Sequence, residues 1–354
     1  MSAVITSEFA TTYRRGGLVA AVFAMQGFGI LTASLVACLT LLATQSLIMQ
    51  DGVVVLDLVW RICVGVGLIP SLVSVYFRFT MPETPEYTKQ HAKDAATATP
   101  QKASWGEFAR YFRPWRRLKI LLGTCIAWFA LDVAFYGLNL NNAIILTAIG
   151  FSNQGTPYDQ LFSNAVGNII IALLGTVPGY WVSVFTIDRL GRKKIQIGGF
   201  ALLTLLYLIL GVAYQPILNT SVYLFITLFT LAQFFTNFGP NCTTFVIPGE
   251  VFPTRVRSTA HGVSAASGKL GAIVAQVGFS QLVNIGGKGM FVDKLMIIFA
   301  VFTLIGGIVT FWIPETARKP LDVIEREIDG DATVIGLSPK EIEDQRIQSY
   351  VNIF

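Results

Sequence analysis

Eight long apolar segments, separated by shorter polar stretches, dominate the sequence. They lie near residues 17–44, 58–80, 118–141, 163–186, 195–214, 220–247, 259–285 and 291–313. Each is long enough to cross a hydrocarbon core of about 30 Å as an α-helix. The segments are continuously apolar and do not alternate between apolar and polar residues, which disfavours a membrane β-barrel. We therefore predict an all-α fold, a polytopic transmembrane helical bundle in which eight spans are present.

Basic residues are unevenly distributed among the polar stretches. Most of the 26 lysines and arginines occur in alternate gaps, at 1–16, 81–117, 187–194, 248–258 and 314–354. The other gaps, at 45–57, 142–162, 215–219 and 286–290, hold Lys288. Because cytoplasmic loops are enriched in Lys and Arg, both termini are expected in the cytoplasm. A glycosylation sequon, Asn219-Thr220-Ser221, falls in an outer loop and agrees with this orientation.

The composition agrees with an integral membrane protein and disfavours other classes. Hydrophobic residues make up 53% and charged residues 13% of the chain, whereas about a quarter of a soluble domain is charged. Positive cytoplasmic loops explain the net charge of +5, so we expect no nucleic-acid partner. The four cysteines all fall in apolar segments, and the two histidines are far apart. No metal-ligand spacing or nucleophile–base set is visible, so we expect no enzyme, no metal and no cofactor.

One order of elements occurs twice along the chain. Each copy has a glutamate, a basic pair, a span with a polar residue near its middle, a second span and a Pro-Glu-Thr triplet. The copies begin at Glu8 and Glu250 and end at the triplets 82–84 and 314–316. Two parallel halves of this kind are typical of major facilitator transporters. Four spans precede the second copy and none precedes the first, so the pattern predicts a major facilitator fold that lacks about four N-terminal helices.

This interpretation divides the chain into four parts. Residues 1–80 would be the remainder of an N-terminal bundle with two spans, and residues 81–117 a cytoplasmic linker. Residues 118–313 would form a C-terminal six-helix bundle, followed by a charged, solvent-exposed cytoplasmic tail at 314–354. Within the linker, the basic and aromatic stretch 105–117 would either lie as an amphipathic helix at the inner surface or stay partly ordered.

Charged residues in the cytoplasmic loops are candidates for a gate. The stretch 188–194 makes a tight turn between two spans, and Gly191 permits that turn. Carboxylates and guanidinium groups at neighbouring helix ends can pair, and such pairs would favour the outward-facing state of a transporter and break when it closes. The basic residues of these loops could also serve only to keep the loops on the cytoplasmic side of the membrane. The candidate gating residues are Glu8, Arg15, Asp188, Arg189, Arg192, Glu250 and Arg255.

Two ionisable residues lie near the middle of predicted spans, Asp132 in 118–141 and Lys269 in 259–285. Charged side chains at this depth are costly, so they indicate a functional site. Trp128, Asp132 and Tyr136 are spaced by four residues and therefore share one helix face. We expect Asp132 and Lys269 to be buried and to face a shared aqueous pocket. The alternative is an Asp132–Lys269 ion pair with a structural role.

Further polar residues near mid-span are Gln26, Asn237 and Asn241, and Pro240 predicts a break in its helix. Together with a lysine, a tryptophan and a tyrosine they supply donors for a small oxyanion. A carboxylate repels a fully ionised anion but accepts a hydrogen bond from one that keeps protons, such as dihydrogen phosphate. By themselves these residues do not separate phosphate from other small oxyanions.

Several stretches of the chain resemble the phosphate:proton symporter family of the major facilitator superfamily, the fungal and plant high-affinity inorganic phosphate transporters. The resemblance is carried by residues 238–255, FGPNCTTFVIPGEVFPTR, and residues 257–269, RSTAHGVSAASGK. Residues 7–10, SEFA, and 25–27, MQG, match the first half of the family. It implies a secondary active transporter that imports inorganic phosphate with protons across the plasma membrane by alternating access. The implied partners are phosphate, protons and the lipid bilayer.

The resemblance also implies roles for individual residues. The positions that match phosphate-contacting residues of the family are Gln26, Trp128, Asp132, Tyr136, Asn241 and Lys269. Asp132 is the candidate for proton coupling. The family has an Asp-Tyr pair just before the position of Ser2 and an acidic residue in its first span, and neither is present here. This departure leaves open an incomplete form that does not transport.

Two alternative functions remain open at this point. A sugar porter of the same superfamily shares the loop motifs, but it would line its cavity with neutral amides and aromatic residues, without Lys269 facing Asp132. A non-transporting phosphate sensor or inactive fragment is the second alternative, and the absence of about four N-terminal helices from the pattern favours it more than any other feature.

Overall fold

The computed structural model describes residues 6, 13–80, 105–152, 155–287 and 289–330, and every regular element in these ranges is helical. This confirms the predicted all-α class. In chain order the elements are α2 (Arg15–Ala43), α3 (Gln45–Thr80), α5 (Trp105–Phe112), α6 (Trp115–Asn139), α7 (Asn142–Ala148), α8 (Pro157–Ile171), the π-helical turn η1 (Ala172–Thr176), α9 (Val177–Leu190), α10 (Arg192–Val212), α11 (Tyr214–Thr220), α12 (Val222–Asn237), α13 (Pro240–Val251), α14 (Thr254–Leu282), α15 (Val292–Thr310) and α16 (Leu321–Asp329).

Seven helical stretches in the described residues are long and apolar enough to cross a membrane. They are Arg15–Ala43, Val54–Phe77, Trp115–Asn139, Pro157–Leu190, Arg192–Val212, Val222–Val251 and Val292–Thr310. The eighth predicted span falls in α14, a helix of 29 residues that is long enough to cross. It is less apolar than the other seven, because polar residues such as Ser264, Ser267 and Lys269 interrupt it.

Helices also occur in stretches that were predicted to lie between or after the spans. The predicted outer gap 45–57 is the first part of α3, which begins directly after Thr44, and the outer gaps 142–162 and 215–219 contain α7 and most of α11. The predicted solvent-exposed tail contains α16, which buries Ile324 and Ile328 against the bundle. These two residues are four positions apart and therefore share one apolar helix face. The many charged residues of the tail made this face hard to recognise in the sequence. Residues 81–104 and 331–354 lie outside the described part of the chain.

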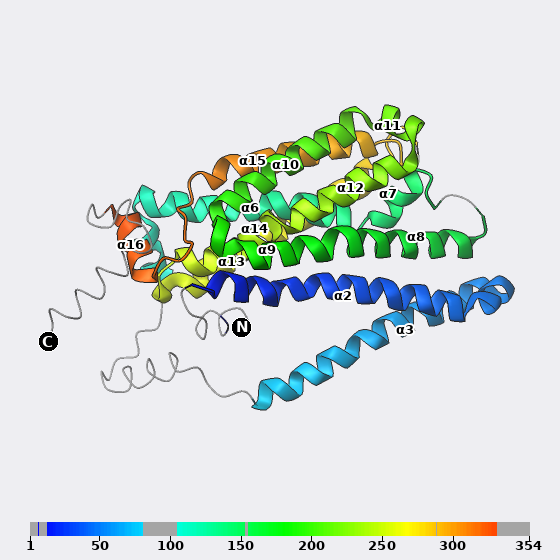
Figure 1. Ribbon diagram of the computed structural model, residues 1–354, viewed down its shortest axis with the longest axis horizontal. Coiled ribbons are helices and arrows are strands. Elements are labelled where there is room, and N and C mark those ends of the chain that lie inside the picture. The colour runs from blue at the N-terminus through cyan, green and yellow to red at the C-terminus, as the bar shows by residue number, and fades with distance from the viewer. Residues whose placement is uncertain (1–5, 7–12, 81–104, 153–154, 288, 331–354) are drawn as a thin grey trace.

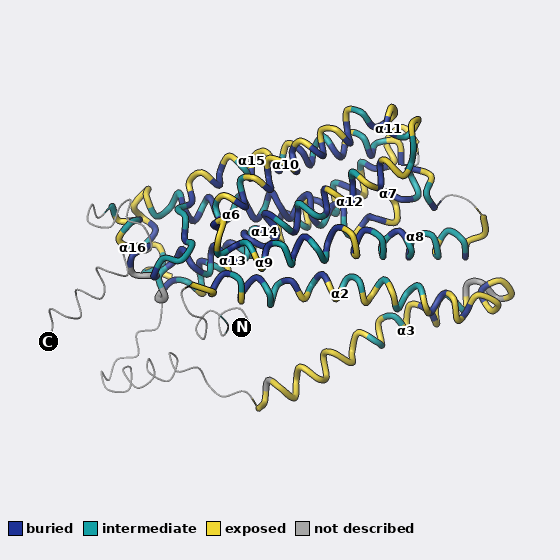
Figure 2. Tube along the Cα trace, viewed as in Figure 1, coloured by how far each residue is buried: buried dark blue, intermediate teal, exposed yellow. Residues whose placement is uncertain are grey.

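The membrane helices form one elongated bundle (Figure 1). The strongest packing joins α6 to α14 and α10 to α15, and α2 lies along α8 and α9. Helix α3 diverges from α2 and is exposed along most of its length (Figure 2). The largest apolar core lies among α6, α10, α12, α14 and α15, where it buries Tyr207, Phe225, Phe279 and Phe299.

A break between α12 and α13 interrupts one span at Phe238 and Gly239. It confirms the break that Pro240 predicts. Helix α10 packs closely against this break at Gly199. A Cβ atom on Gly199 would lie 2.6 Å from Cδ of Pro240, so glycine is needed at that position. The break leaves Asn237 at the end of α12 and Asn241 at the start of α13, where Asn241 Nδ2 donates to Asn237 Oδ1 at 2.8 Å.

Candidate functional site

Asp132 on α6 and Lys269 on α14 face each other. Lys269 Nζ donates a hydrogen bond to Asp132 Oδ2 at 3.3 Å and another to the Tyr136 hydroxyl at 2.6 Å. The side chain of Asp132 is 3% exposed and that of Lys269 is 58% exposed. The expectation that both groups are buried is therefore wrong for Lys269. Its long stem lets the ammonium group reach the buried acid from an exposed surface.

The spacing along α6 brings three side chains of the site to the same helix face. Trp128 and Asp132 are buried, and Tyr136 is half-buried. Gly268 of α14 lies against this face, because a Cβ atom there would be 2.5 Å from Trp128 Cδ1 and 2.8 Å from Asp132 Oδ2. The absence of a side chain at this position thus lets α14 approach α6 and bring the neighbouring Lys269 to the acid.

Replacing Gly268 with alanine is expected to push Trp128 and Asp132 out of position. Overpacking of this kind costs roughly 1–3 kcal/mol, so the thermal midpoint of the purified chain should fall. Gly262→Ala is the matched control, since it lies on the same helix with no neighbouring atom within 4 Å of the added Cβ. That control should be neutral or stabilising, because alanine favours helices over glycine by about 1 kcal/mol. Equal effects of the two variants would contradict the close packing at Gly268.

A second polar group joins α2, α9 and α13 around the hydroxyl of Tyr180. This hydroxyl donates to Gln26 Oε1 at 3.1 Å and accepts from Asn241 Nδ2 at 2.7 Å. Tyr180 is fully buried. Gln26 and Asn241 were predicted to belong to the site, whereas Tyr180, which connects them, was not predicted. A tyrosine in the middle of an apolar span, directly after a Pro-Gly pair, was the available signal.

A chain of aromatic ring contacts connects the two polar groups. Phe245 of α13 lies with its ring centre 6.3 Å from that of Trp128, and it stacks on Phe23 of α2 at 4.5 Å. Phe23 in turn meets the edge of Tyr180 at 5.8 Å. The structure therefore brings Asp132, Tyr136 and Lys269 together near Trp128, at one end of this chain of rings. Gln26 and Asn241 meet at Tyr180, at the other end.

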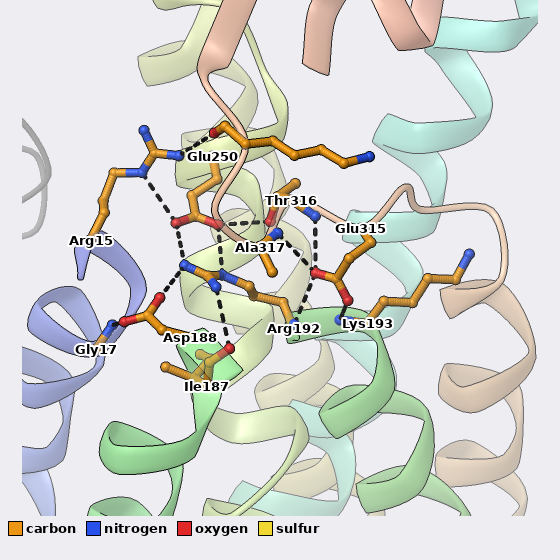
Figure 3. Close-up of polar contacts among 11 residues, drawn as sticks. Arg15, Gly17, Ile187, Asp188, Arg192, Lys193, Glu250, Glu315, Thr316 and Ala317 are labelled. Carbon is orange, nitrogen blue, oxygen red and sulfur yellow. Dashed lines mark hydrogen bonds and ion pairs between the residues drawn. The ribbon is translucent and has the colours of Figure 1, made fainter. Parts of the chain in front are cut away.

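A buried ion network occupies the end of the bundle where α2, α10 and α14 begin, which we call the charged end (Figure 3). Glu250 accepts hydrogen bonds from Arg15 Nε at 3.2 Å and from Arg192 Nε at 2.9 Å. Arg192 also pairs with Asp188 at 2.7 Å, and Asp188 accepts from the backbone N–H of Gly17 at 2.8 Å. Arg192 and Glu250 are almost completely buried. Four of the candidate gating residues thus form one network.

The Pro-Glu-Thr triplet after α15 completes this network. The Thr316 hydroxyl donates to Glu250 Oε2 at 2.7 Å. Glu315 accepts from the backbone N–H groups of Arg192 and Lys193 at 3.0 and 3.1 Å, where α10 begins. A carboxylate is favourable at a helix N-terminus because it satisfies free N–H groups. The triplet was recognised in the sequence as a repeated element, but Glu315 and Thr316 were not among the predicted gating residues.

The other candidate gating residues have different positions. Arg189 is exposed and, among the described residues, does not join the network. Glu8 lies outside the described residues, and so does the side chain of Arg255.

The arrangement at α6 and α14 offers both donors and an acceptor to a small molecule. The ammonium group of Lys269, the hydroxyl of Tyr136 and the indole N–H of Trp128 are donors, and the carboxylate of Asp132 is an acceptor. A charged donor that is more than half exposed beside a buried acid suits a small anion that still carries a proton.

Comparisons with known proteins agree with this fold. The family described as "Sugar (and other) transporter" matches residues 1–328. The repressible high-affinity phosphate permease of Neurospora crassa is 42% identical over 93% of this chain and 66% of its own length. The inorganic phosphate transporter PHO84 of Saccharomyces cerevisiae is 42% identical over 92% of this chain and 64% of its own length. The chain therefore spans just under two thirds of these relatives.

A solved structure of the major facilitator proton:xylose symporter XylE, bound to 6-bromo-6-deoxy-D-glucose, has a similar fold. The TM-score is 0.65 with 21% sequence identity, and the match covers 92% of this chain and 70% of that chain. At this identity the likeness concerns the fold alone. On the family match, the curated relatives and the common fold, the chain belongs to the sugar (and other) transporter family of the major facilitator superfamily.

Proposed function

We propose that the protein imports inorganic phosphate together with protons by alternating access. The observation that carries this proposal is the group of Asp132, Tyr136 and Lys269, in which a lysine contacts a buried acid and a tyrosine hydroxyl between two packed helices. The names of the fungal relatives, a phosphate permease and an inorganic phosphate transporter, support phosphate as the substrate.

The buried acid favours phosphate over anions that carry no proton. Lys269 would neutralise the negative charge of dihydrogen phosphate, and Asp132 would accept a hydrogen bond from one of its O–H groups. Sulfate has a similar size, but it is fully ionised near neutral pH and offers no donor to Asp132. The two anions should therefore be discriminated by the acid and not by the lysine.

The further members of the proposed binding site are Gln26, Trp128 and Asn241. Gln26 and Asn241 are held by Tyr180, at the other end of the chain of aromatic rings, and would contact phosphate from there. Asp132 would also carry the coupled proton, because a buried carboxylate exchanges readily between its charged and neutral forms as its surroundings change.

The charged end is the proposed cytoplasmic gate. The network of Arg15, Asp188, Arg192 and Glu250 joins α2 to the helices that follow the linker. Formation of these pairs would hold the helices together in one conformation, and their separation would accompany opening toward the cytoplasm. The excess of basic residues in these loops supports this orientation in the plasma membrane. We retain residues 1–80, 81–117, 118–313 and 314–354 as the proposed division of the chain.

Vesicles that contain the full chain provide the test. Uptake of radiolabelled phosphate is expected to be faster when the outside is acidic than when it is slightly alkaline, and a protonophore should abolish this difference. The reason is that import of phosphate with protons is driven by a proton gradient directed inward. Excess unlabelled sulfate should compete poorly with phosphate, and Asp132→Asn should improve that competition.

Three outcomes would contradict parts of this proposal. Uptake of glucose without phosphate would indicate a sugar porter. Binding of phosphate without uptake under any gradient would indicate a sensor or an inactive form. Equal competition by sulfate in the original protein and in Asp132→Asn would exclude Asp132 as the group that selects a protonated anion.

A further inference from the structure

A basic and aromatic patch lies where α5 meets α6. It consists of the side chains of Trp105, Arg110, Arg113, Trp115 and Arg116, all of which are exposed. The two tryptophans are 75% and 62% exposed. Neither the proposed transport function nor the charged network of the gate uses these residues.

The packing of α5 fixes the orientation of this patch. Phe108 and Phe112 turn toward the bundle, where Phe112 is buried and its ring centre lies 5.6 Å from that of Phe252. A short helix that buries one apolar face must present its opposite face outward. Arg110 therefore projects from a helix that is attached to the bundle, and Arg113 directly follows the end of that helix.

The patch lies at the edge of the membrane, because α6 is a membrane span that begins at Trp115. Tryptophan is enriched at the level of lipid headgroups, where its ring contacts apolar chains and its N–H reaches polar groups. Basic residues next to the start of a span are attracted to anionic lipids. Exposed Trp and Arg side chains at the same boundary have the chemistry of a headgroup site.

Neighbouring acidic residues leave the patch with an excess of positive charge. Asp329 of α16 accepts two hydrogen bonds from Arg117, at 2.8 and 2.7 Å, and its backbone oxygen accepts one from Arg116 at 3.3 Å. A hollow of about 600 Å³ beside the patch is lined by two arginines and two glutamates, namely Arg110, Arg117, Glu107 and Glu325. The two arginines and two glutamates of the hollow balance in charge, so the surplus of the patch lies at Arg113 and Arg116, which are both exposed.

We propose that this patch binds the headgroups of anionic phospholipids in the leaflet that surrounds the charged end of the bundle. The guanidinium groups pair with lipid phosphate and carboxylate oxygens, while Trp105 and Trp115 enter the interface between headgroups and acyl chains. Such binding attaches the beginning of α6, and with it the helix that carries Asp132, to the membrane surface. The inference does not depend on the transported substrate.

Competition between two lipids tests this proposal. The purified full chain is incubated with equal amounts of phosphatidylserine and phosphatidylcholine, and native mass spectrometry counts the lipids that remain bound. The original protein is expected to retain more phosphatidylserine. Each basic residue near a membrane contributes roughly a fivefold preference, so the triple variant Arg110→Gln, Arg113→Gln, Arg116→Gln should lower the preference by about tenfold or more.

A matched variant removes the same charge elsewhere on the same end of the bundle. Arg14→Gln, Lys194→Gln, Arg326→Gln changes three exposed basic residues that lie directly before α2, in α10 and in α16, and it should alter the preference by less than about twofold. Equal losses in the two triple variants would overturn the proposal, because overall charge would then explain the binding. The proposal would also be overturned if the original protein bound phosphatidylserine and phosphatidylcholine equally. Replacing the same three patch arginines with lysine keeps the charge and should keep the preference, which separates binding from misfolding.

Discussion

Replacing Lys269 with alanine is expected to lower the affinity for phosphate by about 10- to 100-fold, since hydrogen bonds from a charged group contribute roughly 1.5–3 kcal/mol. The substitution removes the ammonium group that contacts Asp132 and Tyr136 and leaves a buried carboxylate without its cation. Equilibrium binding of radiolabelled phosphate to the purified chain is the measurement. Lys294→Ala is the matched control, because Lys294 is an exposed lysine whose Nζ lies 4.8 Å from the ring centre of Phe291, away from the site.

The same experiment separates a ligand-binding role from a purely structural ion pair. If the pair only stabilises the protein, Lys269→Ala and Asp132→Asn should each lower the thermal midpoint, and combining them should restore both stability and binding. If the two groups contact phosphate, the double variant should recover stability but still bind weakly. Unchanged phosphate affinity in Lys269→Ala would remove this lysine from the proposed site.

Replacing Glu250 with glutamine is expected to destabilise the protein by up to about 3–5 kcal/mol, the usual cost of breaking a buried ion pair by removing one of its members. Glu250 accepts hydrogen bonds from Arg15, Arg192 and Thr316, and its loss leaves the fully buried Arg192 with Asp188 as its remaining acid. The midpoint of thermal unfolding in detergent should fall clearly, and the open conformation should gain population because the network holds helices together.

An exposed ion pair provides the control for Glu250. Asp57 and Arg61 of α3 pair at 2.8 Å, with side chains 52% and 64% exposed. Pairs of this kind contribute about 0–1 kcal/mol, so Asp57→Asn should change the thermal midpoint little. A similar small change in Glu250→Gln would show that the charged end does not stabilise this conformation.

The pattern of apolar segments was sufficient to predict the fold class and most of the helices. A span in lipid must satisfy its backbone hydrogen bonds internally, so a long apolar segment has few alternatives to a helix. Local spacing also predicted the face shared by Trp128, Asp132 and Tyr136, and Pro240 predicted the break between α12 and α13. For the same reason the prediction was weakest where the pattern is mixed, at the start of α3 and in α16.

The partners of these residues were decided only by the tertiary structure. Sequence spacing says which side chains share a helix face, but not which face of a distant helix lies opposite, because that depends on how all the helices pack. Three contacts join residues that are far apart in the chain. Tyr180 bridges Gln26 and Asn241, and Glu315 caps α10. Gly268 lets α14 approach Asp132. The exposure of Lys269 could not be predicted from the sequence either. The position of a residue along a span gives its distance from the membrane surface, but it does not say whether a neighbouring helix covers its side chain.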